Sequence, residues 1–168
     1  TWTTMIASYA QQGLGEEALD LAPQMWEMGV IPNSITFVNL LYACSHSGLL
    51  NKACEYFILM RLNGIIPTLE HYNCMVDLLG HLGYLEKAMD LLCTMPAMPD
   101  VIGWKSLLTG CKAYGNADLG NHCFNRLSEL VPNDASRYTI MSNIYVDEQH
   151  REETSSPDTL ALEYAHER

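Results

Sequence analysis

Apolar residues recur along this chain at helical spacing, in blocks that glycine and proline separate. In the first block, Trp2–Tyr9 carries apolar residues three and four positions apart, which is the spacing of one helix face. Gly13 predicts the end of that helix, because glycine readily adopts the left-handed conformation of a helix end. Residues 15–28 repeat the pattern, and Pro32 closes the block. The block therefore predicts a hairpin of two helices.

The same markers return through most of the chain. Successive first aromatic residues lie 35, 35, 32 and 34 positions apart, and four of the five are followed 11 positions later by glycine. Each hairpin leaves an apolar face that only a neighbouring hairpin can cover, so the repeat predicts an all-α, right-handed α-solenoid of stacked helical hairpins. The first aromatics are Trp2, Phe37, Tyr72, Trp104 and Tyr138; the glycines are Gly13, Gly48, Gly83 and Gly115; small residues follow at Ala18, Ala53, Ala88 and Gly120.

Composition and charge argue against several classes of protein. The chain has 168 residues, of which 48% are hydrophobic, so a core is expected. No apolar run is long enough to span a membrane, no targeting peptide opens the chain, and its start inside a structured segment suggests a fragment. The net charge of −11 argues against broad, salt-driven binding to nucleic acid, although a few placed side chains can still recognise it.

No catalytic, metal or cofactor site is expected. The six cysteines include no CxxC pair, and we expect them to be reduced and mostly buried. His150-Arg151-Glu152 matches the HxE half of a zinc deaminase signature, but no PCxxC follows it. The chain is therefore not expected to be an enzyme.

Two families build hairpins of this length. Tetratricopeptide repeats need small residues where this chain has Ile6, Leu41, Val76 and Leu108, so they fit poorly. The chain resembles the pentatricopeptide repeat family, in its plant organelle branch with long and short alternating repeats. The segments that carry the resemblance are WTTMIASY (2–9), GEEAL (15–19), GVIPN (29–33), TFVNLLYACSHSG (36–48), HYNCMVDLLG (71–80) and MPAMPD (95–100).

The resemblance also divides the chain. WKSLLTGCKAYGNADLG (104–120) and YTIMSNIY (138–145) resemble the two extension motifs that follow the last repeats in this branch. The pattern breaks after Tyr145, and Ser156-Pro157-Asp158 favours the start of a short terminal helix. The expected units are a clipped repeat at 1–33, a long repeat at 34–68, a short repeat at 69–100, extension motifs at 101–134 and 135–145, and a divergent polar tail at 146–168.

The resemblance implies that each unit recognises one RNA base through two side chains, one after the first aromatic and one at the end of the unit. We call these the recognition pairs. Thr3 and Asn33 resemble an adenine-recognising pair, and Asn73 and Asp100 resemble a uracil-recognising pair. Val38 and Thr68 form the pair between them, in which Val38 cannot hydrogen-bond through its side chain. Ile35 occupies the position from which the family wedges an apolar side chain between bases; Glu70 and Ile102 are its equivalents.

The implied ligand is single-stranded RNA in the register 5′-A-N-U-3′. A simpler interpretation makes Thr3, Asn33 and Asn73 ordinary helix-cap or surface residues. The resemblance further implies C-to-U RNA editing in a mitochondrion or chloroplast, with residues 101–145 docking a DYW-type cytidine deaminase or other editing factors supplied in trans. Two alternatives remain: a protein–protein scaffold without RNA binding, which the acidity favours, and a truncated, non-functional product, which the aberrant tail favours.

Overall fold

The computed structural model describes residues 1–133 and 135–154, except for the side chains of residue 137 and residues 147–154. This part of the chain is entirely helical apart from its turns and connections, which confirms the expected all-α class. Its helices are α1 (Trp2–Gln11), α2 (Gly15–Glu27), α3 (Ser34–Ser47), α4 (Leu50–Leu62), α5 (Leu69–His81), α6 (Leu85–Thr94), α7 (Val101–Tyr114), α8 (Ala117–Leu130) and α9 (Ser136–Thr154).

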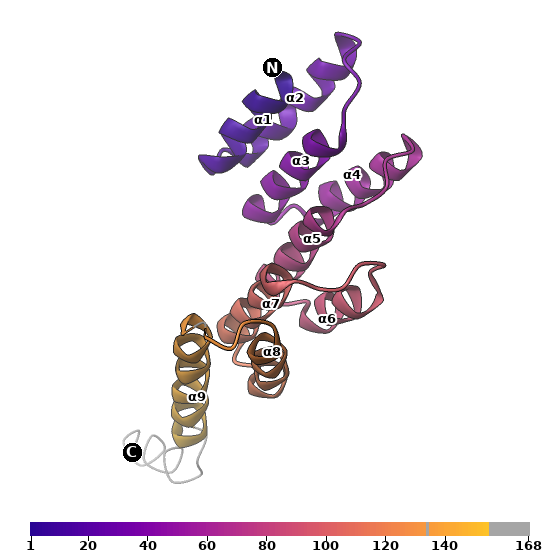
Figure 1. Cartoon of the computed structure of the whole chain (residues 1–168). Helices are drawn as coiled ribbons and strands as arrows, with labels where there is room; N and C mark the ends of the chain where they lie inside the picture. The colour runs from indigo at the N-terminus through magenta and orange to yellow at the C-terminus, as the bar shows by residue number, and fades with distance from the viewer. Residues whose placement is uncertain (134, 155–168) are drawn as a thin grey trace, which may run out of the picture.

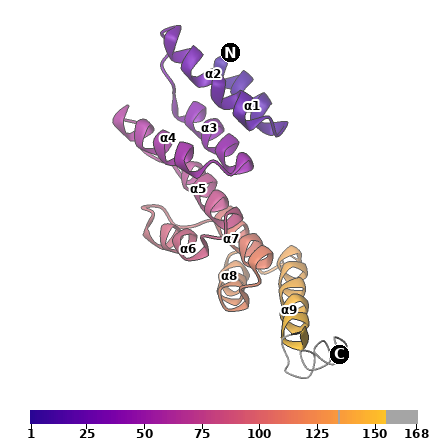
Figure 2. The same cartoon turned by 180° about the vertical axis from the view of Figure 1, so that it is seen from behind.

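The helices are arranged as a stack of antiparallel hairpins. Helices α1, α3, α5 and α7 contact one another in sequence and form one layer, while α2, α4, α6 and α8 each pack on the helix that precedes them. Both views show the stack as an extended, curved body with α1 and α9 at opposite ends (Figures 1 and 2). The expected solenoid of stacked hairpins is therefore confirmed.

The markers that repeat in the sequence explain the shape of each hairpin. The four turn glycines have φ between 64° and 78°, the left-handed region where a side chain would be strained. Ala18, Ala53 and Ala88 are fully buried, and Gly120 is buried as well, because the two helices of a hairpin approach closely at these positions. The small residues thus set the distance between paired helices.

The core runs along the stack as two clusters of buried residues, one from α1 to α5 and one from α5 to α9. Met25, Met60, Met95 and Leu127 occupy equivalent positions at or just past the second helices, and all four are buried. Phe37 of α3 and Trp104 of α7 are buried, whereas Trp2 of α1 is only half-buried. Each unit thus buries its apolar stripe against its neighbours, as expected for a solenoid.

The last described helix runs past the point where the repeat pattern breaks. The family resemblance ends after Tyr145, and α9 continues as one helix to Thr154. The residues beyond Tyr145 are rich in Glu, Gln and Arg, which have high helix propensity and need no apolar stripe to extend a helix. Met141 and Ile144 of α9 are buried against the preceding hairpin. The short helix expected from Ser156 lies outside the described residues.

The cysteines are only partly as expected. Cys44, Cys111 and Cys123 are buried and Cys74 is half-buried, but Cys54 and Cys93 are exposed because they lie on the solvent side of α4 and α6. All six are free thiols. Among the described residues, no helix is both long and apolar enough to cross a membrane.

Candidate nucleic-acid interface

The residues that close the units are the N-caps of the next first helix. Asn33, Thr68 and Asp100 precede α3, α5 and α7 and have extended backbone conformations. Asn33 Oδ1 accepts the backbone N–H of Thr36 at 2.9 Å, and Asp100 Oδ1 accepts that of Gly103 at 3.0 Å. Such caps satisfy backbone donors that have no partner inside the helix. The side chain at the closing position therefore caps the next helix in the first and third units.

The two residues of the first recognition pair, Thr3 and Asn33, both hydrogen-bond to Thr36. The Thr3 and Thr36 hydroxyl oxygens lie 3.1 Å apart, across the α1–α3 contact. The Thr36 hydroxyl donates to Asn33 Oδ1 at 3.0 Å, which leaves the Thr3 hydroxyl as the donor to Thr36. Thr36 thus joins two residues that are 30 positions apart in the sequence. The Thr3 oxygen keeps its capacity to accept, and the Asn33 amide nitrogen carries donors.

The third recognition pair is in direct contact. Asn73 Nδ2 donates to Asp100 Oδ1 at 3.1 Å, from α5 to the cap of α7. Only 7% of Asn73 is exposed, and its Oδ1 is buried without a hydrogen-bond partner. A buried polar atom without a partner costs roughly 1–3 kcal/mol. Asn73 is therefore more buried than the surface or cap interpretation expects, and its hydrogen bonding is incomplete.

Gly103 makes this contact fit. A Cβ at position 103 would lie 2.8 Å from Asn73 Oδ1 and 2.8 Å from Leu92 Cδ2. Both distances are well below ordinary van der Waals contact. The absence of a side chain at residue 103 therefore lets the Asn73 amide lie against the first turn of α7.

The second recognition pair shows no such contact. Val38 is half-buried on α3, and its side chain has no polar atom. Thr68 is exposed, and its hydroxyl donates to Glu70 at 2.5 Å. This hydrogen bond is the main reason that the pKa of Glu70 is lowered, with the backbone N–H of Glu70 contributing as well. The pair has little to offer a base beyond the Thr68 hydroxyl.

Two further residues, which the repeat pattern does not mark, build this interface: Thr36 and His71. Each lies three positions after a cap and directly before a first aromatic, the spacing of a capping box, which could have identified them. His71 is fully buried; its Nδ1 accepts the backbone N–H of Thr68 at 3.1 Å. Its Nε2 therefore carries the proton and donates to the Ser34 carbonyl at 3.0 Å.

Burial lowers the pKa of His71, while the Ser34 carbonyl and the Glu70 carboxylate act in the opposite direction. The ring is thus neutral and links α5 to the start of α3 through hydrogen bonds. Its two hydrogen bonds join the start of one unit to the end of the same unit. The recognition residues are consequently held by a fixed hydrogen-bond framework.

Aliphatic side chains lie beside these pairs. Ile35 in the first turn of α3 is 62% exposed, and Ile102 in the first turn of α7 is 61% exposed. The equivalent residue of α5, Glu70, is also exposed but charged. At two of the three positions, an aliphatic side chain is therefore exposed to solvent.

The described residues contain no group of three or more His, Cys, Asp and Glu side chains that could hold a metal ion. Burial raises the pKa of the Cys44 and Cys74 thiols to about 12, so both are protonated at neutral pH and poor nucleophiles. The side chains of His150 and Glu152 lie outside the described part of the structure.

Comparison with known proteins matches the repeat pattern. A model of the PPR repeat family matches residues 1–46, and a model of the PPR repeat matches residues 35–65 and 70–98. The mitochondrial pentatricopeptide repeat-containing protein At2g03880 of Arabidopsis thaliana is 45% identical over 150 residues, covering 89% of this chain and 24% of that protein. Another, At3g26782, also named mitochondrial, is 46% identical over 148 residues, covering 88% of this chain and 22% of that protein. The chain thus spans about a quarter of the length of these relatives.

Solved structures share the fold. The pentatricopeptide repeat protein PPR10 from maize superposes with a TM-score of 0.71 at 22% identity, covering 99% of this chain and 24% of that one. PPR10 in complex with an 18-nucleotide psaJ RNA element gives a TM-score of 0.73 at 16% identity, covering 90% and 23%. Repeat spacing, helical hairpins and matched models agree, and the chain belongs to the pentatricopeptide repeat family.

Proposed function

We propose that this chain is part of a protein that binds single-stranded RNA, with one base facing each recognition pair. The observation that carries the proposal is the buried, unpartnered Oδ1 of Asn73 beside Asp100. A structural cap network would gain from satisfying this atom, and a nucleic-acid base can supply the missing donor. The family relationship supports the same ligand, because the related PPR10 is solved in complex with RNA.

Uracil suits Asn73 and Asp100. Its Watson–Crick edge places the N3–H donor between two carbonyl acceptors. An asparagine amide that turns outward can accept from N3–H and donate to a neighbouring carbonyl. Because Asn73 Oδ1 has no partner in the free chain, that turn breaks no hydrogen bond of the oxygen. The carboxylate of Asp100 would keep the amide oriented.

Adenine suits Thr3 and Asn33. Adenine presents the N6 amino donor beside the N1 acceptor. The Thr3 oxygen can accept from the amino group, and the Asn33 amide nitrogen can donate to N1. Guanine presents the reverse order, an N1–H donor beside an O6 acceptor, and would leave both groups mismatched. The framework around Thr36 thereby favours adenine.

These assignments give the register 5′-A-N-U-3′, with the middle base poorly discriminated by Val38 and Thr68. Ile35 and Ile102, which are largely exposed, would pack between or beside successive bases. Three units give weak binding, on the order of 100 μM or weaker, because association costs several kcal/mol before any gain appears. The net charge of −11 adds no general attraction.

The finer part of the proposal concerns RNA editing. We infer that the parent protein directs C-to-U editing in a mitochondrion or chloroplast, and that residues 101–145 dock a DYW-type deaminase or other editing factors supplied in trans. The support is the resemblance of residues 104–120 and 138–145 to extension motifs, together with relatives that are named mitochondrial. Helices α7, α8 and the buried part of α9 form the body that would carry this contact.

The test of RNA recognition is fluorescence anisotropy with a labelled RNA of ten nucleotides that contains A-N-U, against a scrambled sequence. The protein preparations are the wild type, Asn73→Ala and, as a matched control, Asn51→Ala at an exposed position of α4. We expect the wild type and Asn51→Ala to prefer A-N-U, and Asn73→Ala to lose roughly threefold to tenfold, the value of one or two hydrogen bonds.

Equal binding of both RNAs by the wild type would contradict the base assignments. Far-UV circular dichroism must show that Asn73→Ala remains folded, since Asn73 is also buried. The editing proposal needs a separate test: a purified deaminase domain should convert a cytidine near A-N-U more rapidly when this chain is added. An unchanged conversion rate would remove editing and leave RNA binding untouched.

A further inference from the structure

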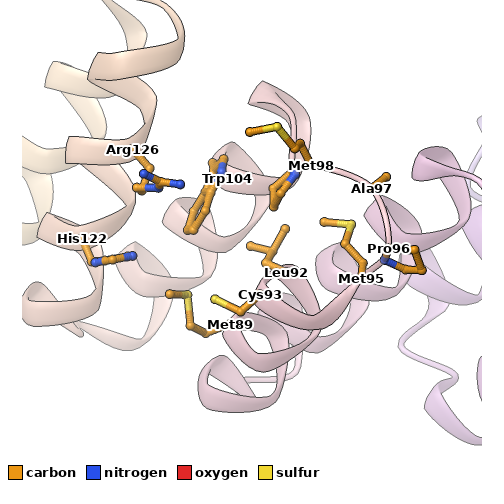
Figure 3. Close-up of a pocket in the computed structure, with 11 residues that line it drawn as sticks. Met89, Leu92, Cys93, Met95, Pro96, Ala97, Met98, Trp104, His122 and Arg126 are labelled. Atoms are coloured by element: carbon orange, nitrogen blue, oxygen red, sulfur yellow. The ribbon is translucent and has the colours of Figure 1, made fainter.

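A cavity separates the third unit from the one that follows it. It lies between α6, the connection at residues 95–100 and α8, and has a volume of about 530 Å³ (Figure 3). Helix α6 beside it has 10 residues, whereas α2 and α4 have 13 and α8 has 14. Pro96 and Pro99 keep the connection from extending the helix, since proline lacks the backbone N–H that a helix interior needs.

The lining of the cavity is apolar and rich in sulfur. Met89, Met95 and Met98 contribute thioethers, and the exposed Cys93 contributes a thiol. Met98 is 83% exposed at the rim, and Leu92 and Trp104 form the buried floor. Methionine side chains adapt to differently shaped apolar partners, which suits a site for a protein side chain.

The polar side of the cavity is basic. Arg126 lies over the Trp104 ring, with its guanidinium carbon 5.7 Å from the ring centroid, and the His122 ring is 5.8 Å from the same ring. Figure 3 shows both reaching from α8 toward Trp104. The lining contains no acidic residue, although the chain has 20 acids against 9 bases. The lining itself therefore offers a guanidinium and an imidazole but no carboxylate, on an acidic protein.

Arg126 also pairs with Glu129 at 2.8 Å. Both side chains are largely exposed, and an exposed ion pair contributes only about 0–1 kcal/mol. A carboxylate from a partner can replace Glu129 at little cost. Arg126 is thus positioned to bind an anionic group at the edge of an apolar cavity.

We propose that this cavity docks a protein segment in which a large apolar side chain is flanked by carboxylates. The apolar side chain would enter among the methionines, and a carboxylate would pair with Arg126. The floor argues against an RNA base, because Trp104 is only 3% exposed and Arg126 covers its ring, so no aromatic face is free for stacking. The inference sharpens the docking part of the proposed function and rests on it.

The test uses the full chain with Trp2→Phe and Trp26→Phe, which makes Trp104 the single tryptophan, excited at a wavelength that tyrosine does not absorb. The probes are eight-residue peptides, blocked at both ends, that carry leucine, phenylalanine or methionine between two glutamates. Control peptides replace both glutamates with lysine, or the apolar residue with serine. We expect the acidic apolar peptides to change Trp104 emission at concentrations at least tenfold lower than either control.

Two variants locate the binding. Cys93→Phe fills the cavity and should weaken the peptide at least fivefold, whereas Cys54→Phe, at an exposed position of α4, should leave it unchanged. Arg126→Gln should remove the difference between glutamate and lysine peptides. Circular dichroism confirms that each variant is folded.

The proposal is overturned if none of the acidic apolar peptides binds, or if Cys93→Phe and Cys54→Phe behave alike. A change in Trp104 emission with RNA that only Cys93→Phe abolishes would reassign the cavity to nucleic acid. Preference for A-N-U RNA is measured on the same variants. If that preference persists while peptide binding is absent, the docking inference fails and the RNA proposal stands.

Discussion

Single residues at the unit boundaries have an observed role in capping helices and a proposed role in recognising bases. Asn33 and Asp100 are helix caps in the structure, and we propose that they also close the recognition pairs. The two roles are compatible because a cap uses one oxygen and leaves the rest of the side chain for a ligand. A substitution at these positions therefore changes stability and binding together, and each must be measured separately.

Asp100 provides the clearest separation of these roles. Asp100→Ala removes the acceptor for the Gly103 N–H and for Asn73 Nδ2, so we expect a loss of about 1–2 kcal/mol in the free energy of unfolding. Asp100→Asn keeps an oxygen cap and should cost clearly less. Urea denaturation of both variants checks this, and equal losses would show that the cap does not stabilise the helix.

His71 predicts a dependence of stability on pH. Its pKa is lowered in the folded chain, chiefly by burial, and returns to about 6.5 on unfolding. The unfolded state therefore binds the proton more readily, and stability falls as the pH drops below about 6.5 toward the folded pKa. Urea denaturation at pH 7.5 and 5.5 should show a larger loss for the wild type than for His71→Gln. A loss of the same size in both would assign the pH dependence to other groups.

At the scale of helices, the sequence predicts most of the fold. The first aromatics, turn glycines and small residues repeat at fixed intervals, so the hairpins through α8 follow from the pattern. The length of α9 does not follow from the pattern. The second half of this helix has no apolar period, and helix propensity alone favours its extension. The direct contact of Asn73 with Asp100, and the roles of Thr36 and His71, depend on how adjacent units pack.

Alanine substitutions at two facing glycines of the α5–α7 contact should differ in their effect on stability. A Cβ on Gly110 would lie 2.9 Å from the Gly80 Cα and carbonyl oxygen, which are backbone atoms that cannot easily move. A Cβ on Gly80 would have its nearest neighbour, the Ser106 carbonyl oxygen, at 3.4 Å. We expect Gly110→Ala to lose about 1–3 kcal/mol of stability and Gly80→Ala to be nearly neutral. Thermal and urea denaturation compare the two, and a greater loss for Gly80→Ala would contradict the packing described here.

At the scale of the whole molecule, stability is shared between neighbours along the stack. Among the described helices, each unit packs mainly on adjacent units, and α9 covers the end of the α7–α8 hairpin. Ile144 is fully buried there, with its Cδ1 3.1 Å from the position that a Cβ on Gly120 would take. The last helix therefore covers an apolar surface that would otherwise be exposed.

Ile144→Ala should affect one end of the molecule. Truncating this side chain costs roughly 2–5 kcal/mol in a well-packed core. Because solenoid units are coupled mainly to their neighbours, hydrogen exchange should accelerate in α7, α8 and α9 and remain nearly unchanged in α1 and α2. Uniform acceleration along the whole chain would show that the stack unfolds as one cooperative unit.

If the recognition pairs select bases, recoding one pair should change the base that is preferred. Asn73→Thr combined with Asp100→Asn gives the third unit the pair found at Thr3 and Asn33 and retains an oxygen cap. Anisotropy titrations compare wild type and variant with RNAs that contain A-N-U and A-N-A. The account predicts that the wild type prefers A-N-U and that the variant prefers A-N-A, each by about threefold or more. The same preference in both proteins, or none in either, would contradict it.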